Sequence, residues 1–112
     1  MVETRITVGL NDQYTKQQKF HESKYLATLK NICFNYHVAF SLRIENGGYF
    51  HENGEYTEET SLVLTLADAD PAVAEEIARD LCVFFNQESV MVTKCQAETY
   101  FISESISDDI LS

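Results

Sequence analysis

The chain has 112 residues, 45% of them hydrophobic, and its 8 Lys and Arg against 18 Asp and Glu give a net charge of −10. This length predicts one domain, and the apolar content excludes a disordered chain. No apolar run reaches the roughly 20 residues of a membrane helix and no secretory signal is visible, so we expect a cytoplasmic protein without membrane contact. The negative charge repels phosphate, which disfavours direct binding of nucleic acid.

The charge is unevenly distributed along the chain. Residues 1–44 contain six Lys and Arg against three acids, a net charge of +3, whereas residues 45–112 contain two against fifteen, a net charge of −13. A strongly negative later half predicts an acidic surface if its segments share a face.

A strand and a helix are expected first. Residues 4–10 alternate between apolar and polar side chains, which is the period of a half-buried strand. Thr15, with Gln18 three residues later, has the spacing of a capping box and predicts the start of the helix. Apolar side chains between residues 25 and 36 then fall on one helical arc, with the lysines opposite them.

Two further strands follow, over residues 38–45 and 62–66, because apolar side chains again alternate there. Between them, Asn53-Gly54 is the strongest hairpin signal in the chain, since both residue types accept the positive φ of a type I′ turn. The two strands are therefore expected to form a hairpin.

The register of this hairpin raises a conflict of parity. A two-residue turn would set Glu52 opposite Glu55 and even-numbered residues opposite odd ones, although the apolar positions are even in both strands. Either one strand carries an extra residue or the loop holds an odd number. Gly47-Gly48 suits a bulge, so we expect one there and a bent, projecting arm over residues 45–59.

A second helix is predicted at Asp70-Pro71, because Asp caps free amides and Pro at the first helical position loses no needed donor. Asn86 is a plausible end of this helix. A strand follows over residues 90–93, and a further short strand is expected over residues 98–103.

This order predicts an α+β fold, a ferredoxin-like βαββαβ sandwich with an extended acidic β-hairpin and a short extra C-terminal strand. Residues 1–103 would form the single domain and residues 104–112 an acidic tail. Five residues on the apolar faces of their predicted elements are expected among the most buried: Leu29, Phe40, Leu64, Ile77 and Leu81.

The three cysteines are expected to be unpaired. Cys33, Cys82 and Cys95 are odd in number and widely spaced, without the pairs that zinc sites use. Cys33 and Cys82 lie among apolar residues of the predicted helices, so we interpret both as small core side chains.

The runs FSLRIENGGYFHENGEYTEETSLVLTL and FFNQESVMV resemble a family of small bacterial and phage proteins of unknown function. The resemblance covers about half the chain, roughly residues 39–93, and it implies the fold but no activity. The positions that carry it are Gly48, Tyr49, Glu59, Ser61, Phe85, Gln87, Glu88, Ser89 and Val90.

The polar cluster with the most chemistry lies on the hairpin arm. Carboxylates on an exposed ribbon lack the walls that glycoside hydrolysis or a stable metal site requires, so no catalytic residue, metal or cofactor is predicted. Glycines at 47 and 48 lead into a strand and not into a helix, which argues against a phosphate loop. As a surface for a protein partner, the arm offers Tyr49, Glu52, Glu55, Tyr56, Glu58 and Glu59.

Two functions from different classes remain. The first is a non-enzymatic acidic protein that binds a basic partner surface, such as a phage-type inhibitor of a nucleic-acid-binding defence protein, in the manner of anti-CRISPR or anti-restriction proteins that mimic DNA charge. The alternative is a dimeric ferredoxin-like ligand-binding protein or small enzyme with a pocket on the open sheet face. Residues 87–89 are candidates for such a site, although capping of a helix–strand connection explains them equally simply.

Overall fold

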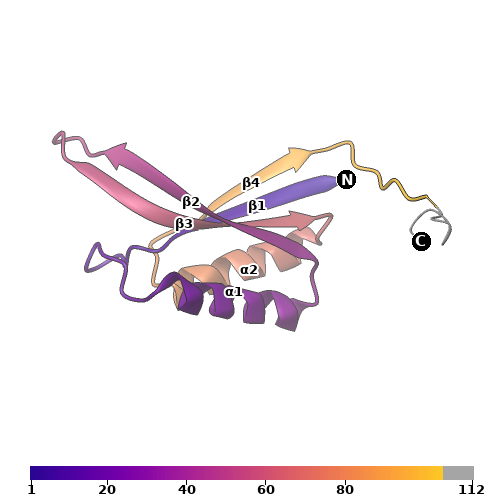
Figure 1. The fold of residues 1–112 in the computed structure, drawn as a ribbon, viewed down its shortest axis with the longest axis horizontal. Coiled ribbons are helices and arrows are strands. Elements are labelled where there is room, and N and C mark those ends of the chain that lie inside the picture. Colours follow the sequence, from indigo (N-terminus) through magenta and orange to yellow (C-terminus); the bar gives the residue numbers. More distant parts are fainter. Residues whose placement is uncertain (105–112) are drawn as a thin grey trace, which may run out of the picture.

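A computed structural model describes residues 1–104 of the chain (Figure 1). Its elements are β1 (Val2–Gly9), α1 (Glu22–Tyr36), β2 (Phe40–Phe50), β3 (Tyr56–Ala67), α2 (Pro71–Phe84) and β4 (Met91–Gln96). The four strands form one antiparallel sheet in the order β2-β3-β1-β4, and both helices cover one of its faces. This is the predicted ferredoxin-like sandwich. Within residues 1–104, neither helix is long and apolar enough to cross a membrane.

The core lies between the sheet and the helices. Even-numbered side chains of β1 and β3, such as Ile6 and Leu64, are fully buried there against Leu29, Ile77 and Leu81. Four of the five predicted core residues are therefore confirmed. Phe40 is 38% exposed, and that prediction was wrong, because β2 is an edge strand with a neighbour on one side only.

The first helix begins later than the capping-box spacing predicted. His21 is its N-cap and accepts a hydrogen bond from the Ser23 amide at 3.1 Å. The Asp12 carboxylate accepts from the amides of Tyr14 and Thr15, both at 2.9 Å, and this closes a turn where the helix was expected. The expected cap at Thr15 was wrong: its hydroxyl does accept from the Gln17 amide at 3.4 Å, but Lys16 has a positive φ of 62°, which is not a helical conformation.

The conflict of parity between the two strands of the hairpin is resolved by the length of the loop that connects them. Phe50 pairs with Tyr56, which leaves a loop of five residues, 51–55, with Gly54 at φ +87°. The predicted bulge was wrong: Gly47 and Gly48 pair regularly with Glu59 and Glu58. Glu52 accordingly does not stand opposite Glu55 in a two-residue turn; the odd loop keeps the even-numbered apolar side chains on the core face.

The second helix begins as predicted, since the Asp70 side chain accepts from the Ala72 amide at 2.8 Å and Pro71 is the first helical residue. The helix ends at Phe84, and Asn86 takes a positive φ of 50° just beyond it.

The expected extra strand over residues 98–103 is wrong. The Ala97 amide still donates to the Met1 carbonyl at 2.9 Å, but the ladder between β1 and β4 ends where Val2 pairs with Gln96. Residues 97–104 form no regular secondary structure, and most of the predicted acidic tail, residues 105–112, lies outside the described part of the chain.

All three cysteines are free, as predicted. Cys33 is buried, and the loss of hydration there raises the pKa of its thiol to about 11. Cys82 is only partly buried and Cys95 is exposed on β4, so the interpretation as a core side chain holds fully for Cys33 alone.

Candidate functional site

The β2–β3 hairpin extends beyond the two helices, and the connection between β1 and α1 lies beside its root (Figure 1). Successive side chains of a strand point to opposite faces, so the even- and odd-numbered residues of the hairpin face different sides. A groove lies on each of these two sides, and the second of them also reaches the α2–β4 connection.

The first, here called the Tyr56 groove, has a volume of about 630 Å³. The Tyr56 ring lies directly over Gly48, where any Cβ would collide with it. The Thr60 hydroxyl donates to the Asn46 side-chain oxygen at 3.1 Å on the same face. Amides, a hydroxyl and one ring dominate its lining: Asn11, Gln18, Asn46, Gly47, Gly48, Tyr56, Glu58, Glu59 and Thr60.

The second, here called the His51 groove, has a volume of about 600 Å³. The His51 Nε2 atom lies 2.8 Å from the Thr57 hydroxyl, and the Tyr49 ring packs edge-on against the imidazole with centroids 5.0 Å apart. Ionisable side chains are frequent in its lining: Asn11, Asp12, Gln13, Lys16, Tyr49, His51, Asn53, Glu55, Thr57, Glu59, Gln87, Glu88 and Ser89.

Glu59 lies where the two grooves meet, since it lines both of them. The Asn11 amide donates to its Oε2 atom at 3.0 Å, and the Asn11 side chain donates to the Glu58 carbonyl at 3.3 Å. A Cβ on Gly9 would lie only 2.5 Å from the Glu59 carboxyl group. Because Gly9 has no side chain, the half-buried Glu59 carboxylate can occupy the space beside it.

The wall of the His51 groove is tied to the end of α2. The Gln87 side chain donates through Nε2 to the Asn11 carbonyl at 2.7 Å, and the Asn86 side chain donates through Nδ2 to the Asp12 carboxylate. Hydrogen bonds to Asp12, above all from the Thr15 amide, hold the pKa of its carboxyl group well below the usual value. Asp12 is therefore a structural anion that fixes the loop.

The structure divides the predicted partner-binding residues among three places. Tyr49 and Glu55 line the His51 groove, and Tyr56 and Glu58 line the Tyr56 groove. Glu59 lines both grooves, whereas Glu52 lies in the loop at the hairpin tip and lines neither.

Sequence reasoning missed the residues that the loop after β1 contributes, chiefly Asn11, Lys16 and Gln18. Their only signal in the sequence is a glycine at the end of the first strand followed by Asn11-Asp12, a pattern that is equally typical of a simple strand end. Residues 87–89, left open above, do lie against the hairpin.

The charges that line the His51 groove favour a ligand that carries positive charge together with one anionic group. Glu55, Glu59 and Glu88 supply carboxylates, whereas Lys16 is the one Lys or Arg in the lining. Within residues 1–104, no group of three or more His, Cys, Asp or Glu side chains is placed to bind a metal ion.

No family model matches the chain, and no curated protein matches its sequence. Solved structures do share its fold. A phage SAM lyase in complex with S-methyl-5′-thioadenosine has a TM-score of 0.67 at 20% identity, covering 85% of this chain and 80% of that one. The apo state of a phage SAM lyase has a TM-score of 0.65, again at 20% identity, with coverage of 89% and 92%.

CutA1 from Pyrococcus horikoshii OT3 is similar over more of the chain but less closely. Its TM-score is 0.54 at 14% identity, and the match covers 99% of this chain and 91% of that one. At these identities the similarities establish the fold alone, a small ferredoxin-like architecture found in phage and microbial proteins.

Proposed function

We propose that the chain is a small enzyme that binds S-adenosylmethionine across the two grooves and cleaves it to S-methyl-5′-thioadenosine. The observation that carries this proposal is the position of Glu59, a carboxylate held by the Asn11 amide where the two grooves meet, with amide side chains and an aromatic ring on one side and ionisable side chains of both signs on the other. S-adenosylmethionine has a matching division, with a nucleoside and a charged amino acid on either side of a sulfonium ion.

The Tyr56 groove suits the nucleoside half. Its Tyr56 ring offers an apolar surface for a planar base, and the side chains of Asn11, Gln18 and Asn46 offer both donors and acceptors for a base edge or ribose hydroxyls. The similarity of the fold to a phage SAM lyase that holds S-methyl-5′-thioadenosine supports this assignment.

The His51 groove suits the amino acid half. Glu55 and Glu88 offer carboxylates to an ammonium group, and Lys16 offers an ammonium group to a carboxylate. Glu59, between the grooves, would then lie next to the sulfonium ion and hold it by charge.

The proposed cleavage needs no cofactor. The carboxylate of the amino acid half attacks the γ-carbon of the same half while the C–S bond to that carbon breaks. Both electrons of the broken bond go to sulfur, which leaves as a neutral thioether, and the four-carbon fragment leaves as a lactone. In this scheme the chain orients the substrate, and Glu59 keeps the sulfonium in place until the bond breaks.

The test measures binding of S-adenosylmethionine and of S-methyl-5′-thioadenosine by calorimetry, and thioether release by chromatography. Glu59→Gln should weaken binding of the sulfonium at least tenfold but that of the uncharged thioether much less, because only the former carries the charge. The matched control is Glu52→Gln, an exposed carboxylate in the hairpin loop that lines neither groove, which should retain most of the affinity. Absence of binding by the folded wild type, or equal sulfonium affinity in Glu59→Gln, would contradict the proposal.

A second candidate function rests on the hairpin tip. Glu52, Glu55 and Glu58 are exposed on the projecting arm, and none makes an ion pair with another residue in the part of the chain that the structure describes. Such a row of carboxylates suits a groove lined by Arg and Lys on a protein partner, as in a phage-type inhibitor that mimics nucleic-acid charge.

Charge reversal tests this second function. Glu52, Glu55 and Glu58 would be changed to Lys together, leaving Glu59 and its hydrogen bond from Asn11 intact. A partner captured from host lysate should bind the wild type, release it at high salt, and bind the folded triple variant at least tenfold more weakly. Equal affinities would exclude the tip as the binding surface.

A further inference from the structure

A third cavity shares only Asp12 with the His51 groove and lies at the end of the helical layer that faces the β1–α1 connection. This Phe20 pocket has a volume of about 180 Å³, close to the size of an apolar void that holds one benzene. Its lining combines aromatic side chains with two lysines: Asp12, Lys19, Phe20, Lys24, Tyr25, Thr28, Phe84, Phe85 and Asn86.

The floor of the Phe20 pocket is closed and its rim is exposed. Tyr25 and Phe85 are buried, with ring centroids 5.2 Å apart. Phe20 and Phe84 stand at the rim with 48% and 64% of their surface accessible. Two large aromatic side chains around an unfilled pocket form an apolar surface of the kind that binds another chain.

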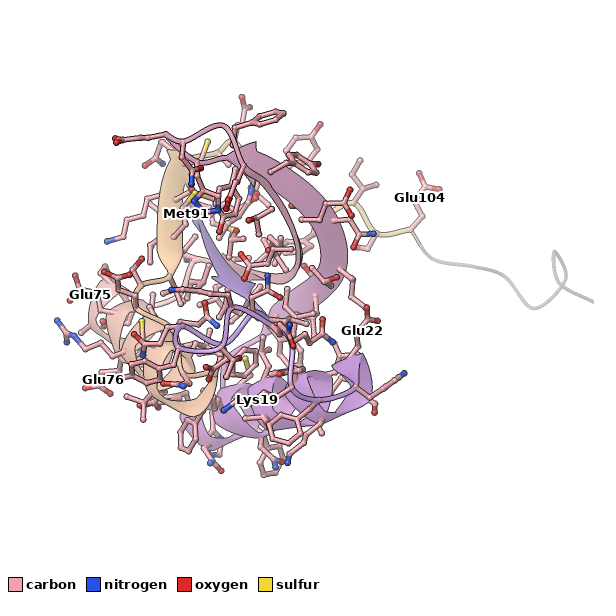
Figure 2. The ribbon with its side chains drawn as sticks, turned by 90° about the vertical axis from the view of Figure 1, so that its left-hand side faces the viewer. Lys19, Glu22, Glu75, Glu76, Met91 and Glu104 are labelled. Atoms are coloured by element: carbon pink, nitrogen blue, oxygen red, sulfur yellow. The ribbon has the colours of Figure 1, made fainter. Side chains whose placement is uncertain are left out.

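The rim also carries the positive charge of an otherwise acidic chain. The Lys24 ammonium lies 3.7 Å from the centroid of the Phe20 ring, and Lys19 is 3.4 Å from the Asp12 carboxylate. Figure 2, which looks onto this end of the molecule, shows Lys19 beside the start of α1. Between residues 13 and 31 the sequence has four lysines and a single acid, Glu22. The pocket therefore favours a segment that is both apolar and anionic.

We infer that the Phe20 pocket binds the C-terminal segment of a second copy of this chain. The last ten residues, SESISDDILS, contain three acids, no Lys or Arg, and the pair Ile110-Leu111 directly after Asp108-Asp109. An aliphatic side chain of that pair fits the pocket volume, and the two aspartates then face Lys19 and Lys24 at the rim.

The reach of the chain favours a second copy over the same molecule. Ala97 is hydrogen-bonded at the Met1 end of β1, whereas the Phe20 pocket lies beyond the Gly9 end, and residues 98–104 lead away from the sheet (Figure 1). The eight residues of β1 alone span about 26 Å, and the eight residues after Glu104 reach at most about 28 Å when fully extended. These eight residues are therefore too short to run back along the molecule from Glu104 and enter the Phe20 pocket of the same chain.

The test uses the full-length chain and a fluorescent synthetic peptide of residues 103–112. Fluorescence polarisation should show saturable binding that weakens as salt rises, since the contact includes exposed ion pairs. Replacing both aspartates by Asn in the peptide, or Ile110 and Leu111 by Ser, should weaken binding at least fivefold. Absence of saturable binding, or equal binding of the peptide in which Ser replaces Ile110 and Leu111, would overturn the inference.

Matched protein variants locate the contact. Phe84→Ala and Lys24→Glu should each weaken peptide binding at least fivefold. Phe34→Ala and Lys30→Glu, which alter an equally exposed aromatic and an exposed lysine elsewhere on α1, should leave it unchanged. Equal losses in target and control variants, with all four folded by circular dichroism, would remove the contact from the Phe20 pocket.

Dilution distinguishes binding of the segment by a second copy from binding within the same molecule. Amide NMR signals of Lys24 and Phe84 should shift when the wild-type chain is diluted, and the shift should be absent in a chain ending at Glu104. Signals that differ between the two chains but do not change on dilution would show that each molecule binds its own segment, which would overturn the second-copy assignment.

Discussion

At the scale of single residues, Gly9 and Glu59 compete for one small volume at the root of the hairpin. The two residues are fifty positions apart, yet a methyl group on Gly9 would meet the Glu59 carboxyl carbon at 2.5 Å. Because that carboxyl group is the far end of a flexible side chain, it is able to move away, but only by giving up the hydrogen bond from the Asn11 amide. Gly9 is in this sense part of the site.

Gly9→Ala should therefore affect ligand binding more than stability. We expect a change in unfolding free energy of about 1 kcal/mol or less, because one partly exposed hydrogen bond is lost. The affinity for S-adenosylmethionine should fall at least tenfold. Gly47→Ala is the control for stability, since a Cβ there meets nothing within 4 Å, and it should leave the unfolding free energy unchanged. Calorimetry and thermal melts check both quantities; an affinity in Gly9→Ala equal to that of the wild type would show that binding does not depend on the present position of Glu59.

Tyr36 offers a pH-dependent test of helix packing. Its hydroxyl donates to the Asp80 carboxylate at 2.8 Å, and this contact raises the pKa of Tyr36 to about 12. Because the folded pKa lies above the unfolded value of about 10, the stability from this contact is complete below pH 10 and disappears as the pH rises through about 12.

An ultraviolet absorbance titration of the folded chain should accordingly show one of its six tyrosines ionising late, near pH 12. Tyr36→Phe should remove that step alone, and in denaturant it should move to the ordinary range near pH 10. A late step that persists in Tyr36→Phe would assign it to another residue.

At the scale of elements, α2 combines a buried face and an exposed one within three residues. Leu81 is completely buried in the core, whereas Val83 is 75% exposed. Leu81→Ala should reduce the free energy of unfolding by about 2–5 kcal/mol, from lost apolar contacts and the cavity left behind. Val83→Ala should stay within about 0.5 kcal/mol. Urea unfolding followed by circular dichroism compares the two, and similar costs would contradict the observed face of the helix.

Element type and order were predictable from the sequence because apolar periodicity and local caps determine them. The alternation in β1 and β3 and the Asp70-Pro71 cap are local signals, and the structure confirms them. The start of α1 was missed because Asp12 closes a turn through the amides of Tyr14 and Thr15, and Lys16 then takes a positive φ of 62° that no helix contains. The bulge was missed because a five-residue loop satisfies the same parity.

The site itself was only half predictable. The hairpin carboxylates were visible as an acidic run, but their division between two grooves depends on which face of the strand each residue occupies. The contribution of Asn11 and Gln87 arises from contacts across 48 and 76 positions of sequence. No local pattern contains such contacts.

At the scale of the whole molecule, the charge asymmetry of the sequence becomes an asymmetry in space. The lysines after β1 gather around the start of α1, near the Phe20 pocket, whereas the hairpin tip carries Glu52, Glu55 and Glu58. Salt screens interactions between exposed charges beyond roughly 10 Å at 0.1 M, so the repulsion within the acidic segments depends on ionic strength. The thermal stability of the chain should therefore rise as salt is added from a low starting concentration.

Reversing the charge of the hairpin tip should reduce the dependence of thermal stability on salt concentration. Each Glu→Lys substitution adds two positive charges, so changing Glu52, Glu55 and Glu58 moves the net charge from −10 to −4. The side chains are exposed, so the fold should persist and the triple variant should melt at least as high as the wild type in low salt. The corresponding Gln variant, with a net charge of −7, should fall between them. Melting curves at two salt concentrations provide the measurement. A variant that melts lower than the wild type in low salt would show that these carboxylates stabilise the fold through attraction to the lysines around α1 and do not repel the other acids.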